Sequence, residues 1–294
     1  MSKLLRANFC RLSKDVLFYI VVLVNTVLTI LFANDLYRHG NVESFYLTIQ
    51  PIIYSVFVAF YVGKEYGNGT IRNKLVCGHT RSSLYLSYLI TCIAATLISI
   101  IPGIIILCIW NIKFFSAIKL SVAILILLGY LLLHCACCAL FVAVGFIIPS
   151  KAVCVVVVIL VAFMMIFLSE YSTEALSESK TLSEVVFNAD GTQTIIKGEK
   201  ENPDYVDGLA RTVLYRAQEF IPSAQVAEYG NLLSIWRVAW EGTQTIDTTD
   251  CDMVFKDSNT VMQDIQYRFF LNQMALIIIS TLGGCLLFRR KNLK

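Results

Sequence analysis

Long apolar runs constrain the fold of this chain more than any other feature. Six runs lie near Val16–Ala33, Tyr46–Gly63, Ser83–Trp110, Leu120–Pro149, Ala152–Leu168 and Phe269–Phe288. The hydrocarbon core of a bilayer is about 30 Å thick, and an α-helix needs about 20 apolar residues to cross it. The runs therefore predict an all-α polytopic membrane protein with six transmembrane helices. The composition agrees, because 15% of the residues are charged, against about 25% in soluble domains.

Lysines and arginines of the short connecting segments gather on one side of the predicted bundle. They precede the first run, occupy the loop 64–81, recur at Lys151 and follow the last run. Because basic residues are retained on the cytoplasmic side, both termini are predicted to be cytoplasmic. The predicted organisation is a cytoplasmic amphipathic helix over 1–15, transmembrane helices 1–5 over 16–169, an extracellular domain over 170–266, helix 6 over 267–288 and a tail over 289–294.

The N-terminal 15 residues show helical periodicity. Leu5, Phe9, Leu12 and Val16 recur at the spacing of one helix face, and most basic residues fall elsewhere. This pattern predicts a basic amphipathic helix in the membrane interface. The alternative is a basic flank that only sets the orientation of the first span.

The segment 170–266 contains 17 acidic and 7 basic residues. A chain with an acidic outer segment and a basic inner face is not expected to bind nucleic acid. Two apolar stretches around Asn188–Gly191 predict a small β-hairpin. Asn202-Pro203 predicts a helix start, with a buried stripe of Tyr205, Leu209, Val213, Ala217 and Phe220. A second helix is expected to bury Val226, Leu233, Trp236 and Trp240, and residues 242–260 are expected to be irregular.

Motifs for catalysis or cofactor binding are missing from the sequence. No G-x-x-x-x-G-K-[ST] loop occurs, so the chain itself is not expected to bind ATP. His134-Cys135-Ala136-Cys137-Cys138 is too closely spaced for a metal site on one helix face. Lys151 is the only charged residue from Leu120 to Leu168, whereas ion-coupled carriers usually keep a charge at membrane depth. We predict a non-catalytic chain without a cofactor or metal; if it transports, its driving force comes from another chain.

One polar stretch, KEYGNGTIRNKLVCGHTR from Lys64 to Arg81, interrupts the apolar runs. Thr70 is expected to cap a short helix that begins at Ile71, and Gly78 is placed where a helix commonly ends. Ile71, Leu75 and Val76 would form a small apolar face, with Arg72 and Lys74 beside it. The helix is thus expected to be a basic knob at the membrane surface. The alternative is a solvated loop whose charges only fix the topology.

Three motifs carry a resemblance to a known family. Glu65-Tyr66-x-x-Gly69-Thr70-Ile71-Arg72-Asn73, followed by Gly78-x-x-Arg81, resembles the first cytoplasmic loop of type-two ATP-binding-cassette (ABC) exporter permeases. Asn202-Pro203-Asp204-Tyr205-Val206-x-Gly208-x-x-Arg211 and Ile221-Pro222-Ser223-x-Gln225 resemble the outer domain of small Gram-positive permeases near peptide-antibiotic resistance operons. The resemblance covers the whole chain in layout and these stretches in motif.

The resemblance implies that the loop helix is a coupling helix, which docks on a separately encoded ATPase. It implies that Ile71, Leu75 and Val76 form the docking face, and that Arg72 and Lys74 form its polar rim. Glu65 would brace the end of the second span by pairing with Arg72 or Lys74. The remaining residues of the motif, which would shape or flank the loop, are Gly69, Thr70, Gly78 and Arg81.

The expected function is therefore the permease subunit of an ATP-driven exporter in a bacterial cell membrane. Two ATPase subunits, a second identical or different permease subunit and membrane lipid would be its partners. The cargo would be an amphipathic peptide, an antibiotic or a lipid-like molecule. Two other classes stay open: a receptor or sensor for extracellular peptides, and a channel or ion-coupled carrier, which the lack of membrane-depth charge disfavours.

Overall fold

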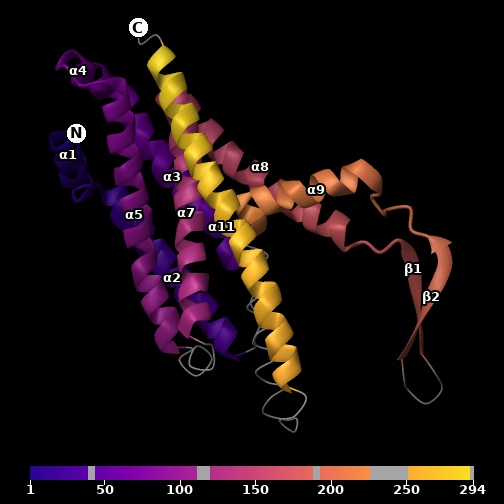
Figure 1. The fold of residues 1–294 in the computed structure, drawn as a ribbon. Helices are drawn as coiled ribbons and strands as arrows, with labels where there is room; N and C mark the ends of the chain where they lie inside the picture. The colour runs from indigo at the N-terminus through magenta and orange to yellow at the C-terminus, as the bar shows by residue number, and fades with distance from the viewer. Residues whose placement is uncertain (39–43, 111–119, 188–192, 226–250, 292–294) are drawn as a thin grey trace.

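The computed structural model describes residues 1–38, 44–110, 120–187, 193–225 and 251–291. In chain order the elements are α1 (Ser2–Leu12), α2 (Val16–Arg38), α3 (Ser44–Gly67), α4 (Thr70–Val76), α5 (Arg81–Trp110), α7 (Leu120–Ile147), α8 (Lys151–Ser177), β1 (Thr181–Phe187), β2 (Gln193–Glu201), α9 (Gly208–Phe220) and α11 (Cys251–Arg290). The long helices form one bundle, with α1, α4 and the C-terminus at the same end (Figure 1). We call this end the α4 end.

Five helices within the described ranges are long and apolar enough to cross a membrane. These stretches are Val16–Ala33, Arg81–Trp110, Leu127–Ile147, Lys151–Ser177 and Tyr267–Arg290. In a bilayer a helix satisfies its own backbone polar groups, which is why such apolar sequences adopt this structure. The architecture is compatible with a multi-pass membrane protein, as the hydropathy predicts. The second predicted span lies in α3, which is not among the five and contains Gln50, Pro51 and Ser55. The sixth span therefore remains a prediction.

Aromatic side chains fill the core near the α4 end. The ring of Phe146 on α7 contacts those of Tyr85 and Tyr88 on α5, with centroids 5.2 and 5.5 Å away, and that of Phe288 on α11 at 5.0 Å. All four side chains are fully buried. The contacts with Tyr85 and Phe288 are edge-to-face, a geometry that stabilises beyond burial alone. They join three long helices at one level of the bundle.

Helix α11 lies very close to α5 and α7. A Cβ atom on Gly284 would lie 2.9 Å from Cβ of Ala143 and would also meet the Tyr85 phenol. That phenol donates a hydrogen bond to the Ser280 carbonyl at 3.2 Å. Only glycine leaves room for this approach. A Cβ on the neighbouring Gly283 would meet nothing within 4 Å.

The N-terminal helix is present, and one of its faces packs against the bundle. Leu4, Asn8 and Leu12 of α1 are buried, whereas Phe9 and Val16 are exposed. The predicted placement of the Leu5, Phe9, Leu12 and Val16 stripe in the membrane interface stays a prediction, and Leu12 is the member of that stripe that packs inside the protein. Asn8 belongs to the buried face, since its amide donates to Ser87 Oγ at 3.2 Å on α5.

The helices at both borders of the segment 170–266 run past the predicted bounds. Helix α8 continues to Ser177, and α11 begins at Cys251. The expectation of irregular structure over 242–260 was therefore wrong for 251–260, and 242–250 lie outside the described residues. Hydropathy marks where a helix leaves the apolar layer, whereas backbone hydrogen bonding propagates beyond it.

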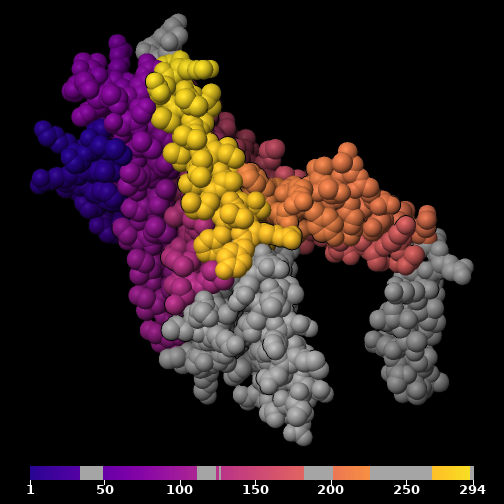
Figure 2. All heavy atoms as spheres, viewed as in Figure 1, coloured from indigo at the N-terminus to yellow at the C-terminus, as the bar shows by residue number. Residues whose placement is uncertain are grey.

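Between these helices, the described residues form two strands and one helix. Strands β1 and β2 pair antiparallel, with Val186 opposite Thr194 and Phe187 opposite Gln193. The predicted turn, 188–191, lies outside the described residues, as does the predicted helix over 226–240. Helix α9 projects sideways from the bundle together with the end of α8 (Figure 2).

Helix α9 begins later than predicted. Its N-cap is Asp207, whose carboxylate accepts from the Gly208 amide at 2.7 Å. The predicted start at Asn202 was wrong because that side chain is used in a turn. Its Oδ1 accepts from the Asp204 amide at 3.0 Å, and its Nδ2 donates to Glu178 Oε2 at 2.7 Å.

The predicted buried stripe of α9 was also wrong. No residue of this helix is buried, and Leu209 and Val213 are 81% and 57% exposed. Of the other stripe residues, Tyr205 and Ala217 are half-buried and Phe220 is exposed. An amphipathic pattern identifies an apolar face and does not identify what covers it.

Candidate functional site

The loop after α3 folds as the sequence predicts in its main feature, a short helix between two glycines. Gly69 and Gly78 have φ of 66° and 87°, the left-handed region that glycine adopts readily. Helix α4 ends before Gly78, as predicted, in a glycine-terminated motif. The Gly78 amide donates to the Leu75 carbonyl at 3.0 Å, and the His79 amide to the Lys74 carbonyl at 3.3 Å. Thr70 is the first helical residue and Gly69 is the N-cap, so the predicted cap was off by one residue.

The apolar residues of α4 do not form one exposed face. Ile71 is 2% exposed and belongs to the hydrophobic core, and Leu75 packs against that core. Val76, in contrast, is 80% exposed. The expectation of a joint docking face was therefore wrong for Ile71. A helix of two turns that must be attached to the bundle uses its largest apolar side chains for that attachment.

Arg72, Asn73, Val76 and Cys77 form the exposed face of α4. We call these four residues the outer face of α4. Arg72 was expected at a polar rim and is exposed, as that expectation requires. Lys74 was expected beside it, but its side chain is 19% exposed and points into the protein.

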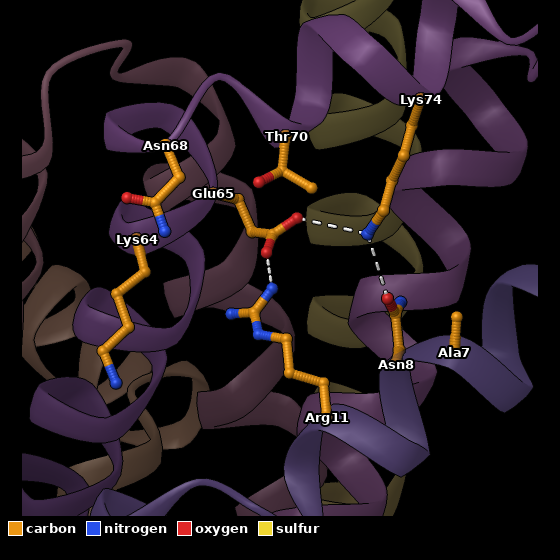
Figure 3. Close-up of a pocket in the computed structure, with 8 residues that line it drawn as sticks. All are labelled: Ala7, Asn8, Arg11, Lys64, Glu65, Asn68, Thr70 and Lys74. Carbon is orange, nitrogen blue, oxygen red and sulfur yellow. Dashed lines mark hydrogen bonds and ion pairs between the residues drawn. The ribbon is translucent and has the colours of Figure 1, made fainter.

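Glu65, at the end of α3, is the centre of a buried ionic cluster (Figure 3). Its carboxylate forms ion pairs with Arg11 of α1 and with Lys74 of α4, the latter at 3.2 Å, and accepts from the Tyr88 phenol of α5. The predicted pairing of Glu65 with Lys74 is present. Four elements therefore meet at one carboxylate, and Arg11 of α1 is the partner that is distant in the sequence.

Burial of the Glu65 carboxylate is unfavourable by itself, and the nearby ammonium of Lys74 offsets this effect. Burial raises the pKa of Glu65, and the Lys74 ammonium opposes that increase. The Lys74 ammonium also donates to Asn8 Oδ1 at 3.2 Å and contacts the Tyr88 phenol oxygen. The ion pairs of this cluster stay formed because breaking one would leave a buried charge with neither a partner nor water around it.

Arg11 is a cluster residue that the sequence interpretation missed. Its guanidinium contacts Glu65, donates to the Tyr61 carbonyl at 3.1 Å and lies 4.5 Å from the Tyr61 ring centre. One signal could have found it. A carboxylate that directly follows an apolar span needs donors, and the basic residues of the N-terminal helix are predicted to lie on the same side of the membrane as those of the loop 64–81.

A hollow of about 300 Å³ opens beside this cluster, between α1, α3 and α4. Seven of its eight lining residues have polar or charged side chains, and basic side chains come from all three helices. The lining residues are Ala7, Asn8, Arg11, Lys64, Glu65, Asn68, Thr70 and Lys74.

Arg81, the last residue of the loop motif, contacts the end of α11. Its guanidinium donates to the carbonyls of Phe288 and Arg289, at 3.3 and 2.9 Å, and to that of Lys291. It therefore caps the C-terminal end of α11, where carbonyls lack helical partners.

Lys291, directly after α11, adds two further contacts at this end of the helix. Its ammonium donates to the Phe146 carbonyl and the Tyr66 phenol, each at 3.0 Å. Burial lowers the pKa of Lys291 to about 8. Together Arg81 and Lys291 fix the end of α11 to α3, α5 and α7.

Polar groups inside the bundle bond neighbouring helices, as the sequence interpretation allowed. His134 of α7 lies 2.7 Å from Gln50 Oε1 of α3. The Asn25 amide of α2 donates to the Tyr54 phenol of α3 at 3.0 Å and to Ser99 Oγ of α5 at 3.3 Å. These contacts tie the helices together, and no group of three metal-ligating side chains occurs among the described residues.

The two outer motifs also make structural contacts. Ser223 donates to the Met165 carbonyl of α8 at 2.7 Å, and Gln225 accepts from Gln273 of α11 at 2.9 Å. Arg211 donates to the Leu176 carbonyl at 2.9 Å, with its guanidinium 4.5 Å from the Tyr205 ring centre. The motifs thus attach α9 and the residues that follow it to α8 and α11.

Comparison with known proteins leaves the function to be argued from these contacts: no family model matches the chain, and no curated protein matches it.

Proposed function

We propose that this chain is the transmembrane permease subunit of an ATP-driven ABC exporter, and that α4 is its coupling helix. The proposed assembly has two permease subunits, identical or different, and two ATPase subunits that bind and hydrolyse ATP. In this proposal the chain lies in a bacterial cell membrane with six spans, both termini cytoplasmic and the segment 170–266 outside. The cargo class is an amphipathic peptide, an antibiotic or a lipid-like molecule.

The proposal is carried by one observation: α4 is attached firmly to the bundle through one face and exposes the other. Its outer face is exposed, while Ile71 and Lys74 attach its other face to the bundle. A small helix that only connected two spans would not need a buried ionic cluster beneath it. Exposed contact residues on a rigidly attached helix are what a protein partner needs in order to move the spans.

The Glu65 cluster supplies a path for that movement. A push on α4 acts through Lys74 on Glu65 of α3 and on Tyr88 of α5. Both helices extend from the α4 end along the bundle. Nucleotide-dependent closure of the ATPase pair would thus change the tilt of two helices together, an alternating-access cycle driven from one end.

Co-purification of an ATPase tests the proposal. Tagged wild type and Val76→Asp would be extracted in mild detergent from their native membranes. The wild type is expected to retain a P-loop ATPase, and Val76→Asp to lose most of it. Val76 is a better choice than Leu75 for this test, because Leu75 packs against the core and its replacement would disturb folding.

Leu209→Asp is the matched control, since Leu209 is 81% exposed and Val76 80%. It introduces the same charge on an equally exposed apolar residue of α9. A wild type that retains no P-loop ATPase contradicts the proposal. Equal loss in both variants contradicts the assignment of α4 as the docking element.

A receptor for extracellular peptides is the second candidate function, and the exposure of α9 favours it. Leu209 and Val213 present apolar side chains beside a segment with an excess of acidic residues. In this version the full-length protein binds cationic amphipathic peptides without any ATPase, and Leu209→Asp weakens that binding while Val76→Asp does not.

A further inference from the structure

The polar hollow at the α4 end has a composition suited to one class of ligand. It lies between α1, α3 and α4, and its lining comes from residues 7–11, 64–70 and Lys74 (Figure 3). We propose that it binds a phosphate group, and that the phosphate belongs to the headgroup of a membrane lipid. This inference goes beyond the proposed transport function and does not depend on it.

The charges around the hollow leave an excess of one positive charge. Arg11, Lys64 and Lys74 contribute three cations. Glu65 balances one of them, and Asp15, whose carboxylate lies 3.2 Å from the Lys64 ammonium, balances another. A phosphate monoanion would complete this balance, whereas a cationic ligand would meet net repulsion.

Hydrogen-bond donors remain available on the same side chains. The Arg11 guanidinium has five N–H groups, and its contacts with Glu65 and the Tyr61 carbonyl engage only part of them. The Lys64 ammonium has a third N–H beyond the two that face Asp15. The Asn68 amide and the Thr70 hydroxyl add neutral donors to the lining. The lining thus supplies charged and neutral donors from three segments of the chain, the kinds of donor that bind phosphate oxygens.

Glu65 is the one anion in the lining, and its surroundings neutralise it. Arg11 and Lys74 both pair with its carboxylate, and the Tyr88 phenol donates to it. An incoming phosphate therefore meets an ionic cluster with net positive charge rather than an isolated carboxylate. The Lys74 ammonium already faces Asn8, Glu65 and Tyr88, so it contributes charge rather than a new hydrogen bond.

The position of the hollow points to a lipid as the source of the phosphate. Asp15, the partner of Lys64, directly precedes Val16, the first residue of an apolar stretch that can cross a membrane. The hollow therefore lies at the level where the chain enters the apolar layer, which is the level of lipid headgroups. Phe9 and Val16 are exposed near the same level and can contact acyl chains.

The test measures binding to the full-length protein in a non-ionic detergent. Short-chain phosphatidylglycerol, short-chain phosphatidylcholine and inorganic phosphate are titrated separately, and the rise in melting temperature gives the half-saturating concentration. Phosphatidylglycerol is expected to saturate wild type at the lowest concentration. Because a charge-assisted hydrogen bond is lost, Lys64→Gln is expected to raise that concentration about tenfold.

Two further variants make the result decisive. Asn68→Leu changes an exposed lining residue without touching an ion pair, so it keeps the test valid if Lys64→Gln does not fold; it is expected to weaken binding several-fold. Arg72→Gln removes the same charge from the same loop outside the hollow, and it is expected to bind like wild type.

The possible outcomes differ in what they say about the site and its ligand. Saturation by inorganic phosphate at the same concentration as the lipid supports the site but identifies free phosphate as its ligand. Equal weakening in Arg72→Gln and Lys64→Gln overturns the site in favour of general surface charge. Absence of saturable binding by all three probes overturns it outright.

Discussion

Two glutamates show how differently the two regions of this molecule hold their charges. Glu65 at the α4 end meets Arg11 and Lys74 with its side chain 3% exposed. Glu219 at the end of α9 meets Arg216 and Arg268 with its side chain 27% exposed, and these arginines are 75% and 69% exposed. The formal charges are the same, one anion between two cations, but the solvent screens only the second set.

The difference indicates which region behaves as one rigid body. At the α4 end, ion pairs, aromatic contacts and helix caps join α1, α3, α4, α5, α7 and α11. Separation of either ion pair of Glu65 would leave a buried charge without its partner. In α9 no residue is buried, and its attachment depends on a few hydrogen bonds to α8 and α11. Motion applied at α4 is therefore passed on, whereas motion of α9 can stay local.

The largest expected effect comes from removal of the buried glutamate. Glu65→Ala leaves two cations without their anion and is expected to cost about 3–5 kcal/mol of unfolding free energy. Glu219→Ala, the matched change at the exposed cluster, is expected to cost less than about 1 kcal/mol. Chemical denaturation of both variants in mild detergent measures the difference. Equal costs would show that the two clusters do not differ in the way their burial implies.

Adjacent glycines of α11 test the close packing of the rigid region. Gly284→Ala places a methyl group against Tyr85 and Ala143 and is expected to cost about 1–3 kcal/mol. Gly283→Ala meets open space and is expected to be neutral or to stabilise by about 0.5–1 kcal/mol, since alanine favours the helix. The same denaturation assay compares them. A harmless Gly284→Ala would contradict the contact between α11 and α5.

Two arginines cap the ends of long helices, one in each region. Arg81→Ala removes donors from the last carbonyls of α11 and is expected to cost about 1–3 kcal/mol of global stability. Arg211→Ala removes a donor from the Leu176 carbonyl of α8, and its effect is expected to be local. Limited proteolysis should cut this variant faster near α9, while its melting temperature stays within about 2 °C of wild type, because a local opening costs less than global unfolding. A global loss in Arg211→Ala would join α9 to the rigid region.

The smallest expected effect is a pH dependence from Lys291. Its pKa is lowered from 10.5 to about 8 in the folded protein, chiefly by burial. Between these values the unfolded chain binds more protons than the folded chain, so stability rises with pH from about 8 towards 10.5. Lys291→Gln should lack this rise. Melting temperatures of both proteins from pH 7.5 upwards measure the effect, and parallel curves would contradict it.

Local chemistry was sufficient to predict some of these features. The hydropathy predicts six spans, and five helices within the described ranges are long and apolar enough to cross a membrane. The positions of Gly69 and Gly78 predict a short helix between two turns. Both depend on residues close in sequence, where length and backbone preference decide the outcome.

Contacts between segments that are distant in the sequence could not be predicted from local residue patterns. The burial of Ile71 depends on core residues of other helices, and the ion pair of Arg11 with Glu65 joins α1 to α3. The apolar stripe of α9 is a second case, in which residues expected to be buried are exposed. Leu209 and Val213 have the spacing of a buried face, but burial also requires a partner surface.

The close fit of α11 has a consequence for biosynthesis. Its partners Tyr85, Ala143 and Phe146 are translated well before it, with α8, both strands and α9 in between. Until α11 leaves the ribosome, the faces of α5 and α7 that it covers have no native partner. A chain released before α11 is complete would keep the Phe146 ring uncovered and would be a substrate for membrane quality control. The packing of the bundle is thus completed late, when α11 is added. The end of α11 is then capped by Arg81, which belongs to a loop translated much earlier.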